Sequence, residues 1–366
     1  MNKGIKIIMG IVIIAILVNL VFLTNFNGNT VKGEKETIRI GVVLPLTGGI
    51  SFLGQAGQKS ILLAKSQLGE TKFNYELIFE DDKLDPKLTS TVTQKLININ
   101  NVDAMISASS GSGNVVAPVT QSKKIVHIGV ASDANIAKGE YNFIHWTTPD
   151  EEARMFVEEV QRRNIKTISS ISVNQQGTDA IIESVQKHLK GTGTKIAYEG
   201  KFNFGETDFK TILLKAKGKN PDAYLIHAFS PELEILAKQA KELGIPELIA
   251  IEAFEFTEQP ELFEGMWYIQ AASSSEDFAK AFEAKYNSQP AMASANLYDA
   301  FNLIVKSYET AAKDGEKPSN QEVAKALSNV RSFNGALGKL KVLDEGIVYS
   351  KASVKQVKNG KFITLR

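Results

Sequence analysis

The sequence predicts an α/β protein built on doubly wound parallel sheets and preceded by an apolar N-terminal segment. Short, almost continuous apolar runs alternate with segments of helical periodicity, which is the pattern of buried parallel strands joined by crossover helices. The alternation runs through twice, over roughly 38–145 and 148–270. At 366 residues, the chain is also long enough for two domains.

The predicted strands are the short apolar runs between polar or turn-forming segments. They cover 38–44, 75–80, 103–107, 125–129, 167–173, 195–200, 223–227, 248–251 and 266–270. The first strand ends in a Pro/Gly turn at 45–48, and a helical stripe follows up to Leu68. After residue 270 we expect helices over 276–287, 292–314 and 321–330, then short β segments at 339–343 and 352–357.

An apolar run at residues 7–23 follows a short basic flank, and Asn19 is its only strongly polar residue. Such a run is typical of a secretory signal or of a single membrane anchor with its basic end inside. Residues 24–37 are polar and suit a linker. We therefore expect an extracytoplasmic protein, in the periplasm or on the outer face of the cytoplasmic membrane, that is anchored by 7–23 or released after cleavage.

Composition and motifs argue against several classes of function. The formal net charge of +1 offers no basic face for nucleic acid, and the chain has no cysteine for catalysis, metal binding or lipid attachment. Phosphate-loop, zinc-protease and nucleophile-elbow motifs are absent. We predict no enzyme, no cofactor and no metal. We interpret Asp81 and Asp82 as solvated or capping acids, and His127 and His227 as satisfied core residues.

In open parallel sheets, ligands bind beyond the carboxyl ends of the strands. The Ser/Gly segment 109–113 follows the third strand and precedes a helix that we expect from about Asn114. Its hydroxyls and free backbone N–H groups suit a carboxylate, although an ordinary capped helix start has the same composition. Glu252 ends an apolar strand, where it could bind an ammonium group or act as a salt-bridge partner. Phe229 could form an apolar wall, although single aromatic residues more often lie in the core.

Four stretches, in this order and spacing, carry a family resemblance. They are IRIGVVLPLTG at 38–48, DDKLDP at 81–86, VAPV at 116–119 after the Ser/Gly segment, and FNGALG at 333–338. Over about 37–360 the chain resembles the leucine/isoleucine/valine-binding family of periplasmic solute-binding proteins, which have the type I fold of ABC uptake systems.

The resemblance implies two lobes with three crossings between them, near residues 147, 271 and 336. The implied parts are a signal or anchor with linker at 1–36, an N-terminal lobe of 37–147 and 271–335, and a C-terminal lobe of 148–270 and 336–366. A small ligand would bind between the lobes and close them, and the closed protein would deliver it to ABC permease subunits in the membrane.

The resemblance also implies which residues bind the ligand. They are Ser110 or Ser112 and the segment Ala131, Ser132 and Asp133 for a carboxylate, Glu252 for an ammonium group, and Gln176, Phe229 and Leu53 around the side chain. Members of the family often have Thr where Asp133 stands, and an anion there would repel a carboxylate unless it turns outward. Gln176 and Leu53 stand where the family commonly has aromatic residues.

Two functions therefore follow. The first is a non-catalytic solute-binding protein of an ABC importer for a branched-chain or similar amino acid. The second is a membrane-tethered sensing domain of the same fold for an amide, nucleoside or other small ligand, which Asp133 and Gln176 favour. A third reading, an α/β enzyme, lacks a visible base and nucleophile at the strand ends.

Overall fold

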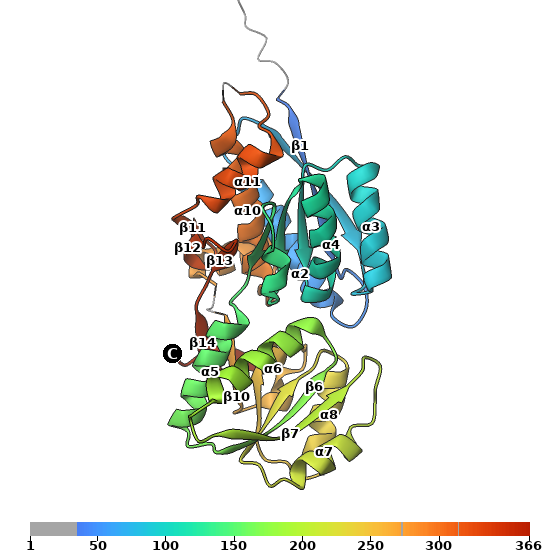
Figure 1. Cartoon of the computed structure of the whole chain (residues 1–366), viewed down its shortest axis with the longest axis vertical. Coiled ribbons are helices and arrows are strands. Elements are labelled where there is room, and N and C mark those ends of the chain that lie inside the picture. The colour runs from blue at the N-terminus through green and yellow to red at the C-terminus, as the bar shows by residue number, and fades with distance from the viewer. Residues whose placement is uncertain (1–34, 272–273, 314) are drawn as a thin grey trace, which may run out of the picture. The chain divides into compact units, whose positions relative to one another are not determined.

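The computed structural model describes residues 35–271, 274–313 and 315–366. Residues Thr37–Arg366 form one compact unit that contains two α/β lobes, each with a sheet between layers of helices (Figure 1). The predicted fold class of two mainly parallel α/β lobes is confirmed. The apolar run at 7–23 lies outside the described residues. In the part of the chain that is described, no helix is long and apolar enough to cross a membrane.

The first lobe has an eight-stranded sheet of order β11-β12-β13-β5-β4-β3-β1-β2. Its strands are β1 (Thr37–Leu44), β2 (Asn74–Asp81), β3 (Ala104–Ala108), β4 (Val126–Val130), β5 (Asn142–His145), β11 (Phe333–Gly335), β12 (Gly338–Val342) and β13 (Ile347–Tyr349). The pairs from β2 across to β13 are parallel, and β12 and β11 continue the sheet in antiparallel pairing.

The second lobe has a seven-stranded sheet of order β15-β14-β10-β9-β8-β6-β7. Its strands are β6 (Thr167–Val173), β7 (Lys195–Phe202), β8 (Ala223–His227), β9 (Leu248–Ile251), β10 (Trp267–Ala271), β14 (Ala352–Lys358) and β15 (Lys361–Thr364). The pairs from β7 to β10 are parallel, whereas β14 and β15 add an antiparallel edge.

Helices follow most of the strands and cover both faces of each sheet (Figure 1). In the first lobe they are α2 (Ser51–Ser66), α3 (Pro86–Asn98), α4 (Ser110–Lys123), the short 3₁₀ helix η1 (Ala134–Ala137), α9 (Glu276–Tyr286), α10 (Ser294–Ala311) and α11 (Asn320–Ser328). In the second they are α5 (Pro149–Arg162), α6 (Gln176–Leu189), α7 (Lys210–Lys217), α8 (Glu232–Glu242), η2 (Ala253–Glu255) and η3 (Pro260–Phe263).

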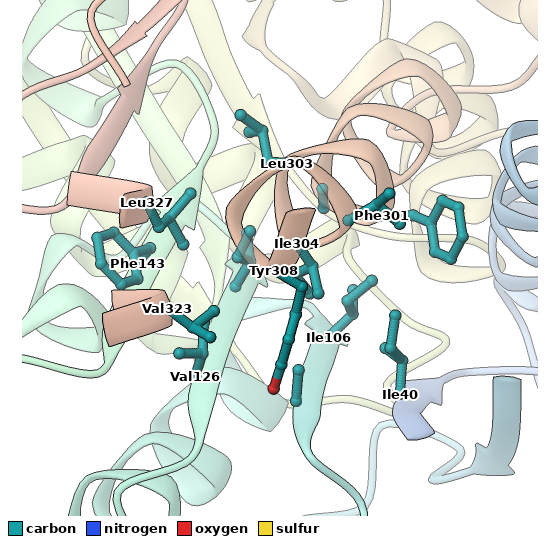
Figure 2. Close-up of a cluster of buried hydrophobic side chains, with 14 of the residues drawn as sticks. Ile40, Ile106, Val126, Phe143, Phe301, Leu303, Ile304, Tyr308, Val323 and Leu327 are labelled. Carbon is teal, nitrogen blue, oxygen red and sulfur yellow. The ribbon is translucent and has the colours of Figure 1, made fainter. Parts of the chain in front are cut away.

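The first sheet is buried on both faces, which explains its nearly continuous apolar strands. On one face, Ile40 and Ile106 of the sheet pack against Ile304 of α10 in the cluster that Figure 2 shows. On the other face, Val43 packs with Leu96 of α3. Because both faces are covered by helices, the strand ends are where this sheet can meet a ligand.

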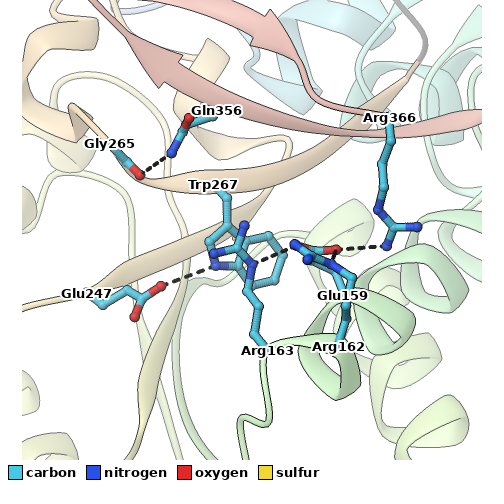
Figure 3. Close-up of polar contacts among 8 residues, drawn as sticks. All are labelled: Glu159, Arg162, Arg163, Glu247, Gly265, Trp267, Gln356 and Arg366. Atoms are coloured by element: carbon cyan, nitrogen blue, oxygen red, sulfur yellow. Dashed lines mark hydrogen bonds and ion pairs between the residues drawn. The ribbon is translucent and has the colours of Figure 1, made fainter.

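A buried carboxylate on α5, that of Glu159, connects several segments of the second lobe. Its side chain has no exposed surface. It accepts hydrogen bonds from Arg162, Arg163 and Arg366 (Figure 3). The hydrogen bonds from Arg162 and the other two guanidinium groups hold the pKa of Glu159 down, at about 2. The Arg163 guanidinium also lies 4.8 Å from the ring centre of Trp267 in β10, so helix, sheet and C-terminal segment are joined at one place.

The third crossing between the lobes lies later in the chain than predicted. Strands β12 and β13 belong to the first sheet, where β13 pairs with β5, so residues 336–349 do not lie in the C-terminal lobe. The chain enters the second sheet only at β14. Strands β5, β11, β13 and β15 were not predicted, because each has at most three consecutive apolar residues, whereas the equally short β9 is apolar throughout.

Helix α4 begins at Ser110, four residues before the expected Asn114. Ser109 has a φ of +87° and caps the helix, since its Oγ accepts a hydrogen bond from the Ser112 backbone N–H at 3.1 Å. A Cβ on Gly113 would lie 2.5 Å from Ile136 Cδ1, so close packing explains a glycine in this first turn. The predicted Ser/Gly loop is therefore mostly helix.

Candidate functional site

A cavity lies between the lobes, at the carboxyl ends of strands from both sheets. It is lined from the first lobe by segments that follow β1, β3, β4 and β5 and by the start of α10, and from the second lobe by segments near the ends of β6, β8 and β9. Six of the nine predicted site residues line it: Leu53, Ser110, Ala131, Ser132, Phe229 and Glu252. The lining does not include Ser112, Asp133 or Gln176.

One end of the cavity carries hydroxyl groups from the first lobe. Ser110 Oγ lies 3.4 Å from Ser132 Oγ and accepts a hydrogen bond from the Asp133 backbone N–H at 3.2 Å. A Cβ on Gly177, at the start of α6, would lie 2.7 Å from Ser110 Oγ and 2.9 Å from Ser132 Oγ. The second lobe thus approaches both hydroxyls closely. Hydroxyls that can donate, next to two helix starts, suit an anionic group.

Ser112 points away from this end and has a structural contact instead. Its Oγ donates a hydrogen bond to Asp82 Oδ2, which also accepts one from Thr89 Oγ1 at 3.0 Å. Asp82 is fully buried, and burial raises the pKa of its carboxyl. The interpretation of Asp82 as a solvated or capping acid was therefore wrong, because the start of α4 and Thr89 of α3 enclose it.

Asp133 turns its carboxylate outward, away from the cavity lining. Its Oδ1 accepts from the Asn135 backbone N–H at 2.9 Å and caps η1, while its Oδ2 accepts from Asn114 Nδ2 at 2.8 Å. The same Asn114 amide donates to Gln176 Oε1 at 2.6 Å. Asp133 and Gln176 therefore belong to a polar contact between the two lobes.

Another part of the cavity wall carries one buried carboxyl. Glu252 follows the end of β9 with a φ of +64°, a backbone conformation that a glutamate rarely adopts. Its side chain is 4% exposed, and its Oε1 accepts a hydrogen bond from the indole N–H of Trp146. Burial raises the pKa of Glu252 to about 7, against the effect of the Trp146 hydrogen bond, which favours the ionised form.

An aromatic wall adjoins this carboxyl. The rings of Phe229 and Phe256 lie 4.4 Å apart between centres, and the His227 ring lies within 6 Å of both, at 5.8 and 5.9 Å. Burial lowers the pKa of His227 to about 4, so that its imidazole is neutral at pH 7. Its Nδ1 has no hydrogen-bond partner among the described residues.

The prediction of satisfied core histidines holds for one of the two. His127 Nε2 lies 2.8 Å from Ser107 Oγ, and its Nδ1 lies 3.2 Å from Asn142 Oδ1. For His227 the prediction was wrong, because this residue is the last of β8 and its ring reaches the cavity.

Sequence reasoning missed several lining residues. Trp146 directly follows β5, which was not predicted as a strand. Met292 and Ala293 directly precede α10, where the strand-end rule does not apply. His227 did carry the signal, since it ends a predicted strand. In residues 35–271, 274–313 and 315–366, no three His, Asp or Glu side chains are grouped as a metal site would require.

Comparison with known proteins extends over nearly all of the described chain. The family described as "Periplasmic binding protein" matches residues 37–361. A relative in Pseudomonas aeruginosa, named leucine-, isoleucine-, valine-, threonine- and alanine-binding protein, is 25% identical over 334 residues, which cover 85% of this chain and 87% of the relative. The resemblance identified from the sequence is confirmed.

Solved structures show the same fold. A leucine binding protein of Thermotoga maritima superposes with a TM-score of 0.83 at 24% identity, covering 90% of this chain and 98% of the other. A solute binding protein from an ABC transporter of R. palustris, solved in complex with benzoate, superposes with a TM-score of 0.81 at 19% identity, covering 90% and 95%. Proteins with this fold thus include ones crystallised with a ligand that has a carboxylate but no ammonium group.

Proposed function

Because this chain belongs to the periplasmic binding protein family, we propose that it is the extracytoplasmic solute-binding component of an ABC importer and that its ligand is an amino acid. The observation that carries the proposal is the composition of the cavity, which combines two first-lobe hydroxyls, one buried carboxyl and an aromatic wall. These are complementary to the carboxylate, the ammonium group and an apolar side chain of a zwitterion.

We assign the ligand contacts as follows. Ser110 and Ser132 donate hydrogen bonds to the ligand carboxylate, and Glu252 accepts from the ligand ammonium group. Phe229 and Leu53 contact the ligand side chain, together with the adjacent Phe256. Ser112, Asp133 and Gln176 have no assigned contact, since their side chains are engaged elsewhere.

The alternative of a sensing domain for a non-amino-acid ligand was favoured by Asp133 and Gln176. Neither residue lines the cavity, so neither supplies a reason to prefer an amide or a nucleoside. A second candidate ligand class does have support. A carboxylate without an ammonium group would still bind Ser110 and Ser132, and Glu252 already has a donor in Trp146.

The chain passes from one lobe to the other near residues 147 and 271 and again at about 350. We further propose that the two lobes close on the ligand and present a joint surface to a membrane permease. Residues 7–23 would hold the protein at the outer face of the cytoplasmic membrane or would be removed on export. The protein itself would carry out no catalysis, in keeping with a receptor whose task is to bind and release.

Isothermal calorimetry on the full chain with L-leucine, L-isoleucine, L-valine and benzoate tests the ligand class. We expect at least one amino acid to bind, and Glu252→Ala to weaken that binding at least about 30-fold, because truncating one side of a buried charge pair costs roughly 2 kcal/mol or more. Glu258→Ala, an exposed acid on the same connection, is the matched control and should leave affinity unchanged. Binding of benzoate alone, or full affinity in Glu252→Ala, would contradict the proposal.

A further inference from the structure

Glu152 is a fully buried acid at the start of α5, with no assigned role in ligand contact. Its two acidic neighbours in the first turn have cationic partners, since Asp150 pairs with Lys187 at 2.7 Å and Glu151 with Arg154 at 2.9 Å. The next residue, Ala153, packs in one core cluster with Ile251 at the end of β9. Helix α5 packs against β9, and Glu152 interacts with Glu252, the residue that follows that strand.

The surroundings of Glu152 suit a carboxylic acid rather than a carboxylate. Among the described residues, no donor group reaches either of its carboxyl oxygens. The group that interacts with it is another carboxyl, that of Glu252. Two buried carboxylates in contact repel each other, and two carboxyls form a hydrogen bond only when one of them is protonated.

The hydrogen-bond partners decide which of the two holds the proton. Glu252 accepts from the Trp146 indole N–H, which stabilises its charge, whereas Glu152 has no such donor. Burial and the charge of Glu252 raise the pKa of Glu152 well above its ordinary value. The pKa of Glu252 is raised less, because the hydrogen bonds from Trp146 and from Glu152 oppose the effect of burial.

The other ionisable groups around the pair do not alter this order. Glu255, in η2, disfavours charge on Glu252, but it accepts hydrogen bonds from Lys355 at 2.9 Å and from Tyr268 at 2.7 Å. Glu151 disfavours charge on Glu152 and is paired with Arg154. His227 lines the same cavity and is neutral at pH 7.

We propose that Glu152 is a positioning residue, which stays a neutral carboxylic acid at neutral pH and donates its proton to the Glu252 carboxylate. Together with the Trp146 indole it would form a two-donor clamp. This clamp fixes the orientation of the Glu252 carboxylate, which is the group that accepts the ligand ammonium. The role given to Glu252 rests on the proposed function, whereas the protonation of Glu152 is a property of the ligand-free protein.

The clamp has a consequence for ligand binding. Above pH 7 the pair holds one proton and carries one negative charge, which a ligand ammonium group neutralises. Below pH 7 the pair takes up a second proton, on Glu252. That proton must be released to the solvent before an ammonium group can bind. The affinity for a cationic group should therefore fall as the pH drops below 7.

Infrared difference spectroscopy on the ligand-free full chain at pH 8 tests the assignment. We expect the spectrum of the wild type minus that of Glu152→Gln to show the carbonyl stretch of a protonated carboxylic acid. Glu151→Gln, one residue earlier, is the matched control and should remove a carboxylate band instead. A carboxylate band in the Glu152→Gln difference spectrum would overturn the proposal. The contribution of Asp82, whose pKa burial also raises, cancels in the difference.

Carbon-13 NMR of the wild type with labelled glutamate carboxyl groups gives the same answer without any variant. One glutamate signal should keep the chemical shift of the protonated acid at pH 8, and a spectrum with every glutamate ionised would overturn the proposal. Neither experiment uses a ligand. A failure of amino acids to bind therefore refutes the proposed function alone, and a failure of these spectra refutes the role of Glu152 alone.

Discussion

Helix α5 carries two buried glutamates whose surroundings are opposite in kind. Glu152 and Glu159 are seven residues apart, about two helical turns, so they lie on the same face of the helix. Both side chains are fully buried. Glu159 accepts hydrogen bonds from three arginines (Figure 3), whereas Glu152 meets the carboxyl of Glu252. The pKa of Glu159 is lowered, mainly by its hydrogen bonds with Arg162, and that of Glu152 is raised by burial.

Burial alone therefore does not set the charge of an acid. At one end of α5 the cations make burial compatible with ionisation, and the result is a structural tie to the C-terminal segment. At the other end burial acts unopposed, and the result is a neutral acid beside the cavity. The same residue type on one helix therefore serves stability in one place and, as we propose, ligand recognition in the other.

The carboxylate of Glu159 should contribute most to the stability of α5 and its neighbours. Glu159→Gln should lower the free energy of unfolding by about 2 kcal/mol at pH 7, because three charge-assisted hydrogen bonds are weakened or lost. Glu152→Gln is the matched substitution on the same helix, and it should change stability by less than about 0.5 kcal/mol, since an amide preserves a neutral donor. Urea unfolding measures both. Equal losses in the two variants would show that the two ends of α5 do not differ as described.

The pH dependence of stability should have opposite signs for Glu159 and for Glu252, the carboxyl that meets Glu152 at the other end of α5. The pKa of Glu159 is lowered, so its contribution is present above the ordinary value of 4.5 and is lost as the pH falls towards about 2. The pKa of Glu252 is raised, so its contribution is present below 4.5 and is lost as the pH rises through about 7.

Glu252→Gln should therefore gain stability relative to the wild type between pH 5 and pH 8, by roughly 2 kcal/mol, because about two pH units separate pH 5 from the pKa of Glu252. Urea unfolding at both pH values gives this difference, and Glu258→Gln serves as the control with no expected change. A variant whose stability relative to the wild type stayed constant across this range would mean that Glu252 does not titrate there.

The sequence could place the cavity but could not orient every side chain towards it. The strand-end rule selected both Ser110 and Ser112, yet residues two apart on a helix point in nearly opposite directions. Which of them faces the cavity depends on where α4 begins, and the helix begins at Ser110 rather than at Asn114. Serine and glycine are compatible with either start, so their pattern could not settle this point.

Contacts between distant segments were beyond the same reasoning. Trp146 follows a four-residue strand, β5, which pairs with a strand from the other end of the chain, β13. Glu152 stands four residues before Phe156 and so lies on the buried face of α5, but next to Asp150 and Glu151 it has the composition of an exposed, acidic helix start. Only the packing of α5 against β9 shows what it meets. The sequence therefore predicts elements and their order well, and it predicts the partner of a buried charge poorly.

One of the three arginines that bind Glu159 should contribute little to stability. The Arg366 side chain is 45% exposed, so solvent screens its ion pair with Glu159, and Arg366→Ala should cost only about 0.5 kcal/mol. Arg331→Ala, which breaks a pair with the largely exposed Asp344, should cost less still and serves as the control. Urea unfolding of Arg366→Ala and Arg331→Ala at low and at high salt measures both losses of stability. If Arg366→Ala cost as much as Glu159→Gln, Arg162 and Arg163 would not suffice to keep Glu159 ionised, and the stability of that end would depend on the tie to the C-terminal segment.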